Sequence, residues 1–310
     1  MGEIEPEAIA ASEQTLAPRK VKLTTRTGIE IARLLPHRTI KTIGAWCFLD
    51  YFGPTNQEEA MNVAPHPHTG LQTVSWLFSG EVEHKDSIGN TARISPGQLN
   101  LMTAGIGIAH SEFSLNRETD LHGLQFWIVL PNEFRNMLPE FSHHDNLPIF
   151  DLENFRIQVI LGDFLNHRST AIIYSQIIGA EILAQQSGIS SLPLNPEFEY
   201  GILSVTSGIT VNGSSIPNGY LHYIPTGATA VEIEAAAGAR CVIIGGVPFD
   251  EEITMWWNFI GRSHEEIVKM RSAWQNDSSR FGKMDSLPGE PIPAPQMPNV
   301  RLVSRSNFSK

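Results

Sequence analysis

The stretch that decides the fold is residues 65–112, PHPHTGLQTVSWLFSGEVEHKDSIGNTARISPGQLNLMTAGIGIAHSE. It opens with His-Pro-His and closes with His-Ser-Glu, so each end places two potential metal ligands one residue apart. On a β-strand, residues i and i+2 point to the same face of the sheet. If the two end strands are neighbours in a closed sheet, three imidazoles and one carboxylate converge on one cavity. The pattern therefore predicts a metal site formed by His66, His68, His110 and Glu112.

This mixed nitrogen and oxygen donor set favours some metals over others. It suits Fe(II), Mn, Ni or Cu(II) better than Ca²⁺ or Mg²⁺, which prefer oxygen ligands alone. Zinc would also bind well by the usual order of affinities, so the residues leave the identity of the divalent ion open. Four protein ligands on an octahedral ion leave two positions for a bidentate substrate, or for a substrate and O₂.

The rest of the chain is rich in short β-forming runs separated by Gly, Pro and Asn turns, a pattern typical of a sandwich or barrel. Strand-like runs on both sides of a polar stretch at 131–148 succeed one another in a similar way, which predicts a duplicated β-barrel. We expect a flexible N-terminal arm over 1–19, a metal-binding domain over 20–148 and a metal-free domain over 149–310.

One helix is predicted late in the chain, at about 263–275. Ser263 followed by Glu266 fits a capping box, and Ile267, Met270 and Trp274 form an apolar stripe at helical spacing. The segment after residue 277 is rich in proline, so we expect it to wrap the surface as an extended tail.

The charge and composition of the chain limit the kinds of partner it can bind and the compartment we expect for it. The formal net charge is −11, and no run of Lys or Arg reverses it locally, which argues against direct binding to nucleic acid or an anionic membrane. No stretch is apolar for long enough to span a bilayer, and the polar N-terminus does not read as a signal peptide. The two cysteines, Cys47 and Cys241, cannot form a secretory disulfide framework, so we expect a cytoplasmic protein.

Three further segments carry a family resemblance together with residues 65–112: FLDYFGP at 48–54, GLQFWIVLP at 123–131 and, more weakly, WWNFIGRSHEEI at 256–267. They resemble the pirin family of the cupin superfamily, in particular its bacterial members. The resemblance implies an all-β bicupin, with two β-barrel (jelly-roll) domains facing each other and metal only in the first. The family's ligands map onto His66, His68, His110 and Glu112, and its usual metal is Fe(II).

The resemblance implies two functions. One is a quercetin 2,3-dioxygenase-type oxidoreductase, in which the metal binds the deprotonated 3-hydroxyl of a flavonol, or of a similar small aromatic substrate, and O₂ attacks the activated ring. The other is a non-enzymatic, metal- and redox-dependent regulator that binds a protein partner, a transcription factor or a metabolic enzyme. The sequence leaves open whether the chain is an enzyme, although we prefer the oxygenase.

Further residues are assigned on the oxygenase hypothesis. Gln72 and Gln125 are candidates for hydrogen bonds that orient ligands or substrate, although many relatives carry Glu shortly after the first histidine pair, where this chain has Gln72. An apolar substrate cavity is predicted from Trp76, Phe78, Phe126 and Trp127. The run Met255-Trp256-Trp257 is interpreted as core or interdomain seam. Six further histidines with no paired ligand are interpreted as surface or packing residues: His84, His122, His143, His144, His167 and His222.

Overall fold

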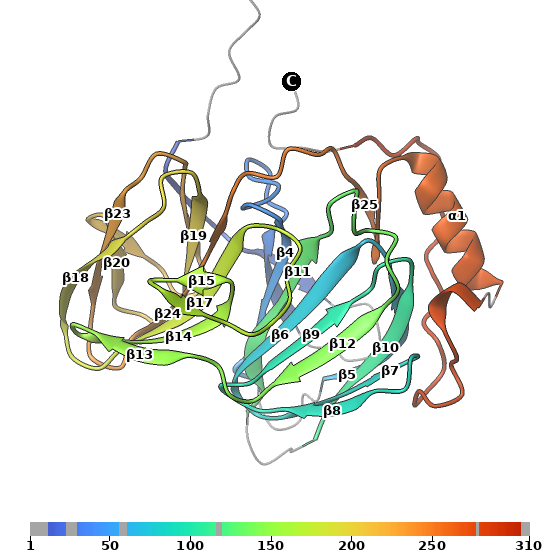
Figure 1. Cartoon of the computed structure of the whole chain (residues 1–310), viewed down its shortest axis with the longest axis horizontal. Coiled ribbons are helices and arrows are strands. Elements are labelled where there is room, and N and C mark those ends of the chain that lie inside the picture. The colour runs from blue at the N-terminus through green and yellow to red at the C-terminus, as the bar shows by residue number, and fades with distance from the viewer. Residues whose placement is uncertain (1–11, 23–29, 56–60, 116–119, 277–278, 305–310) are drawn as a thin grey trace, which may run out of the picture.

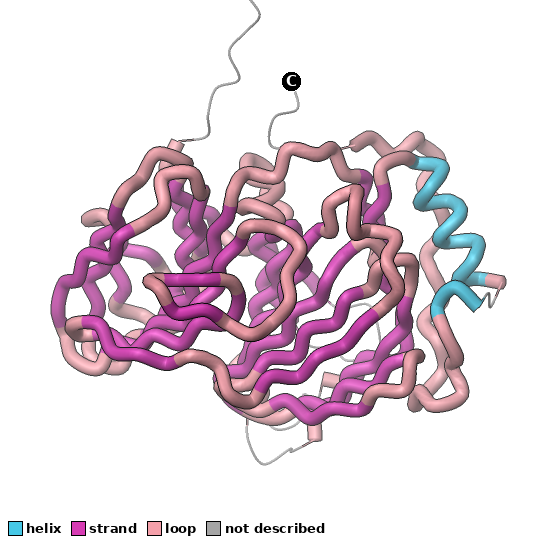
Figure 2. The backbone as a smooth tube through the Cα atoms, in the orientation of Figure 1, coloured by secondary structure: helices cyan, strands magenta, loops and turns pink. Residues whose placement is uncertain are grey.

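The computed structural model describes residues 12–22, 30–55, 61–115, 120–276 and 279–304. Two β-barrels lie side by side, each made of a seven-stranded and a four-stranded sheet (Figure 1). Strands make up about half of the described chain, with one α-helix at an edge of the molecule (Figure 2). The predicted all-β bicupin is confirmed.

The first barrel has a seven-stranded sheet in the order β12-β9-β6-β11-β4-β3-β2 and a four-stranded sheet in the order β5-β10-β7-β8. Every pair of neighbours is antiparallel. The strand bounds are β2 (Arg19–Lys22), β3 (Glu30–Leu35), β4 (Trp46–Phe52), β5 (Asn62–His68), β6 (Leu71–Ser79), β7 (Val82–Asp86), β8 (Thr91–Ile94), β9 (Leu99–Thr103), β10 (Ile108–Ser114), β11 (His122–Val129) and β12 (Glu140–His144).

The second barrel repeats this arrangement, with the orders β1-β22-β19-β24-β17-β14-β13 and β18-β23-β20-β21. Its strands are β1 (Gln14–Leu16), β13 (Ile149–Leu152), β14 (Phe155–Leu161), β17 (Ile177–Ala184), β18 (Gly188–Pro193), β19 (Glu199–Ser204), β20 (Ile209–Val211), β21 (Ser214–Ile216), β22 (Leu221–Ile224), β23 (Ala230–Ala235) and β24 (Arg240–Gly246). Two small hairpins complete the strands: β15 (Asp163–Phe164) with β16 (His167–Arg168), and β25 (Thr254–Trp256) with β26 (Phe259–Gly261).

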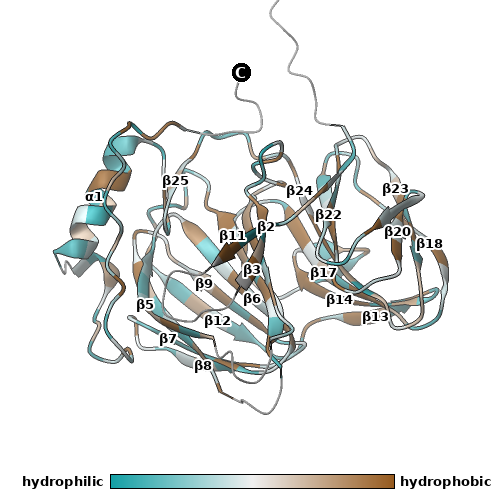
Figure 3. Ribbon diagram, turned by 180° about the vertical axis from the view of Figure 1, so that it is seen from behind, coloured by the Kyte–Doolittle hydropathy of each residue, from teal (hydrophilic) through white to brown (hydrophobic). Residues whose placement is uncertain are grey.

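The two seven-stranded sheets face each other, and their central strands, such as β4, β6, β19 and β24, are buried on both faces. Hydrophobic residues are spread along strands of both barrels (Figure 3). On β24, Val242 and Ile244 belong to the core between the barrels, whereas Cys241 and Ile243 fill the interior of the second barrel. Burial on both faces explains why such strands read as continuous apolar runs rather than alternating ones. The indole of Trp46 adds a polar link, since its Nε1 donates to Ile178 O at 3.2 Å across the interface.

Each described end of the chain packs on the barrel that is formed mainly by the other half of the sequence. Where an arm was expected, residues 14–16 form β1, which pairs with β22 of the second barrel; residues 1–11 lie outside the described residues. At the other end, α1 (His264–Gln275), the 3₁₀ turn η1 (Ser279–Phe281) and the tail pack against the first barrel. The domain bounds expected from the sequence, 20–148 and 149–310, stay predictions.

The predicted helix is present, with the expected buried stripe of Ile267, Met270 and Trp274. Ser263 caps it, because its Oγ accepts the Glu266 backbone N–H at 3.2 Å. The Glu266 carboxylate accepts the Arg262 N–H and binds Arg135 instead of reaching back to the backbone of Ser263. Within the described residues, no helix is long and apolar enough to cross a membrane.

Candidate metal centre

The two ligand pairs lie on neighbouring strands, as the sequence predicts. β5 and β10 are antiparallel, with His66 opposite His110 and His68 opposite Ile108. β5 is at the edge of its sheet, which is where the prolines at 65 and 67 are tolerated, because proline has no N–H for a ladder hydrogen bond. A register shift between His110 and Glu112 brings Glu112 opposite Val63.

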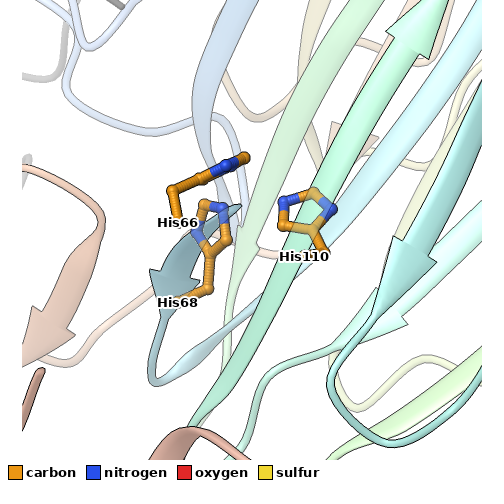
Figure 4. Close-up of side chains that lie close together, drawn as sticks. All are labelled: His66, His68 and His110. Atoms are coloured by element: carbon orange, nitrogen blue, oxygen red, sulfur yellow. The ribbon is translucent and has the colours of Figure 1, made fainter. Parts of the chain in front are cut away.

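His66, His68 and His110 converge in the interior of the first barrel (Figure 4). Their ring centroids are 5.0 Å apart for His66–His68, 4.4 Å for His66–His110 and 5.0 Å for His68–His110. One ring nitrogen from each lies within 4.8 Å of those of the other two, and all three residues are buried. The cluster is thus a possible metal site.

The protonation chemistry of the cluster fits a metal. Burial lowers the pKa of His66 to about 4 and the pKa values of His68 and His110 well below the usual range of a histidine. The rings are therefore neutral at neutral pH, with a lone pair to offer. His66 donates from Nδ1 to Ala64 O at 2.9 Å, which leaves its Nε2 free to bind. His110 Nε2 is buried without a hydrogen-bond partner, as expected for an atom that meets a metal ion.

Glu112 lines the same cavity as the three histidines and is buried. Burial raises the pKa of its carboxyl, opposed by the nearby His84 and by a hydrogen bond from Ser75. Ser75 Oγ is 3.1 Å from Glu112 Oε1 and also 3.1 Å from Gln125 Oε1. The placement of Glu112 as fourth ligand, beside the histidine trio, remains a prediction.

The two glutamines have different positions. Gln125 lines the cavity and is connected to Glu112 through Ser75. Gln72 faces the other barrel, because its Nε2 donates to Thr103 Oγ1 at 2.9 Å and to Ile172 O at 3.1 Å. Gln72 is therefore placed at the interface between the barrels.

His84 was missed as a site residue. Interpreted from the sequence as surface or packing, it is buried, and its Nδ1 is 3.2 Å from His110 Nδ1. With His110 and Glu112 it forms a second group whose ligand atoms lie within 4.8 Å of one another. The signal in the sequence was His84-Lys85-Asp86, another pair of potential ligands at i and i+2.

The cavity above the histidines has a volume of about 260 Å³. Trp127 lines it as predicted and stacks on Phe48, with ring centroids 3.9 Å apart and planes 11° from parallel. The Arg33 guanidinium lies over the other face of this pair, 4.4 Å from the Phe48 centroid, and forms two hydrogen bonds with Asp50. An aromatic surface therefore runs from the histidines to a fixed ion pair.

Three of the four aromatics predicted to line this cavity face the opposite way. Trp76 donates from Nε1 to Glu181 of the second barrel, Phe126 packs on Trp46 and Phe78 contacts Arg240. Met255, Trp256 and Trp257 pack against apolar clusters, as the core interpretation predicts, and Trp257 in addition lines the cavity. It has a left-handed backbone, φ 52°, between β25 and β26, so it is a turn residue that no strand pattern would reveal.

The C-terminal segment supplies a wall of the cavity. Trp257, Asn258 and Ile292 all line it. Ile292 is attached to the histidine strand, since its N–H donates to Pro65 O at 2.8 Å, and its own carbonyl accepts the Trp274 indole N–H. The tail thus closes the first barrel beside His66.

Two facing barrels of this topology, one with a buried cluster of histidines at the base of a cavity, define a bicupin with a possible metal centre. Residues 28–128 match the model of the pirin family, and residues 180–282 match that of the pirin C-terminal cupin domain. The chain therefore belongs to the pirin family.

Its relatives include a Pseudomonas aeruginosa protein provisionally named a quercetin 2,3-dioxygenase, 42% identical over 87% of this chain and 87% of the relative. A pirin-like protein of Caulobacter vibrioides is 31% identical over 86% of this chain and 94% of its own length. Among solved structures, a quercetin 2,3-dioxygenase from Acinetobacter baumannii superposes with a TM-score of 0.89 at 37% identity, covering 94% of this chain and 98% of that one.

Proposed function

We propose that this chain is a metal-dependent dioxygenase of the quercetin 2,3-dioxygenase type, acting on a flavonol or a similar small aromatic compound. The observation that carries the proposal is the position of three neutral imidazoles at the base of an aromatic cavity. His66, His68, His110 and Glu112 would hold one divalent ion, for which we propose Fe(II). When bound, such an ion supplies the one-electron chemistry that lets a closed-shell aromatic react with O₂.

The chain's own residues would bind and orient the substrate. Phe48 and Trp127 present a stacked pair suited to a flat ring, and stacking of this kind is worth about 0.5–1.5 kcal/mol beyond buried area. Gln125 offers an amide beside Glu112 for a substrate hydroxyl or carbonyl. Trp257 and Ile292, which line the cavity from the C-terminal segment, would exclude water from a bound ring.

The names of the relatives support the reaction type. A cavity lined by aromatic and a few polar side chains also fits a small-molecule site, since such sites are concave, mostly apolar and furnished with a few polar groups. A regulator that binds a transcription factor or a metabolic enzyme would not need this cavity, and it remains the alternative outcome of the test.

The test is turnover by the iron-loaded protein. Protein loaded with Fe(II) under argon is mixed with quercetin in aerated buffer, and loss of flavonol absorbance and uptake of O₂ are followed together. We expect both, and we expect His66→Ala to abolish both, whereas His144→Ala, outside the cavity, retains them. Absence of turnover at full iron occupancy would exclude the proposed enzyme and favour the regulatory alternative.

A further inference from the structure

The strand next to the proposed ligands His110 and Glu112 carries a second pair of side chains, His84 and Asp86. β7 runs antiparallel to β10, with His84 opposite Glu112 and Asp86 opposite His110. His84 and Asp86 are two residues apart and therefore share a face of the sheet. The His-x-Glu of β10 is thus backed by a His-x-Asp of β7.

The contacts form a chain that ends in a fixed carboxylate. His110 Nδ1 is 3.2 Å from His84 Nδ1, and His84 Nε2 is 3.4 Å from Asp86 Oδ2. Both β7 residues are almost fully buried, at 2% and 1% exposure. The Asp86 carboxylate accepts the backbone N–H groups of Ile88 and Asn90 and the Asn90 side-chain amide. It is therefore held rigidly by the turn that follows β7.

A further contact fixes the plane of the middle ring. Phe141 of β12 stacks on His84, with ring centroids 4.4 Å apart and planes 14° from parallel. His84 is therefore held at one face by an aromatic ring and at both nitrogens by polar partners.

Only one placement of the protons satisfies every contact while leaving His110 Nε2 free for a metal. An imidazole that binds through Nε2 carries its proton on Nδ1, so His110 donates to His84 Nδ1. His84 then has its proton on Nε2 and donates it to Asp86, an acceptor when ionised. The opposite direction would place a proton on His110 Nε2, the buried atom with no partner.

We propose that His84 and Asp86 are positioning residues that fix the tautomer and the orientation of His110 as a metal ligand. The proposal rests on the metal centre of the proposed function, not on its substrate or reaction. Carboxylate partners behind metal-bound histidines are known to fix ring orientation and raise ligand basicity, and their loss costs about 10–100-fold in metal affinity. Here the Asp86 carboxylate would act on His110 through the imidazole of His84.

Three variants of the full chain test this. His84→Phe keeps a flat ring against Phe141 but removes both nitrogens. Asp86→Asn retains an oxygen for the turn but directs an amide donor at His84, which favours the wrong tautomer in both rings. Lys85→Ala is the matched control, because Lys85 lies between them and forms a surface ion pair with Glu83. Thermal unfolding of each metal-free protein reports whether it folds.

The readout is the affinity for Ni(II) alone, from competition with a chelator, together with the number of imidazoles on the ion from X-ray absorption. We expect about 10–100-fold weaker binding for His84→Phe and Asp86→Asn, an unchanged imidazole count, and wild-type affinity for Lys85→Ala. The double variant should bind no more weakly than the weaker single one, because both changes break the same chain of contacts.

Each other outcome overturns the inference. Wild-type affinity in His84→Phe would show that His84 only packs, and loss of one imidazole would show that it is itself a ligand. If Asp86→Asn alone fails to fold, the Ni(II) affinity of His84→Phe still tests the inference. If wild-type protein binds no metal, the metal centre of the proposed function falls with the inference. If it binds Ni(II) and His84→Phe matches it, this inference alone fails.

Discussion

The indole Nε1 of Trp76 lies 2.6 Å from Glu181 Oε2, so a side chain of the first barrel donates to a carboxylate of the second. Arg240 holds the other carboxylate oxygen at 3.3 Å. Burial raises the pKa of Glu181, opposed by Arg240 and by the bond from Trp76. The pair connects the barrels on the face of β6 opposite to the histidine cavity.

We expect Trp76→Phe to lower the free energy of unfolding by roughly 2 kcal/mol or more, from the lost charge-assisted hydrogen bond and the unfilled volume. Denaturant unfolding of the metal-free protein measures it. A double-mutant cycle with Glu181→Gln isolates the pair, and we expect a coupling of about 1 kcal/mol. Additive effects would show that the bond contributes nothing of its own.

Stability should depend on pH through His122. Burial, with the nearby charge of Arg240, lowers its pKa to about 4. Its folded pKa lies below the unfolded value of about 6.5, so its contribution is complete above pH 6.5 and is lost as pH falls towards 4. We therefore expect the difference in unfolding free energy between wild type and His122→Gln to shrink over that interval. A difference independent of pH would contradict this.

The stacked pair in the cavity should govern substrate binding. Trp127→Leu removes the ring that stacks on Phe48, so we expect KM for quercetin to rise about tenfold, with metal affinity unchanged. Phe126→Leu is the matched control on the same strand: it faces Trp46 between the barrels and should reduce stability but not KM. An unchanged KM in Trp127→Leu together with a raised KM in Phe126→Leu would show that the substrate does not bind against Trp127.

Ser75 should support the carboxylate ligand. Ser75→Ala removes the hydroxyl from between Glu112 and Gln125, and we expect roughly tenfold weaker metal binding. Ser79→Ala, at the end of the same strand, removes a hydrogen bond to the Asp120 carbonyl; neither residue lines the cavity, so affinity should be unchanged. Chelator competition measures both, and equal affinities would remove Ser75 from the site.

His66 and His68 could be predicted to act together because two residues at i and i+2 share a face of one strand. Adding His110 required the assumption that its strand lies beside theirs, and β10 does pair with β5. His84 was missed because its role depends on the register between β7 and β10, which no spacing along the chain reveals. Its i,i+2 partner, Asp86, was the available signal.

The aromatic lining was largely predicted wrongly for a different reason. β6 is buried on both faces, so nothing in its pattern distinguishes residues that face the cavity, such as Ser75, from those that face the other barrel, such as Trp76. Trp257 and Ile292 come from segments far along the chain, and only the packing of the C-terminal segment on the first barrel brings them to the site.

The most direct test of the account is elemental analysis of the purified chain, combined with anomalous scattering from its crystals at the edge of the metal found. We predict one divalent ion per chain, with its anomalous peak among the imidazoles of His66, His68 and His110 and the carboxylate of Glu112. A chain free of metal, or a peak outside that cavity, would contradict the account.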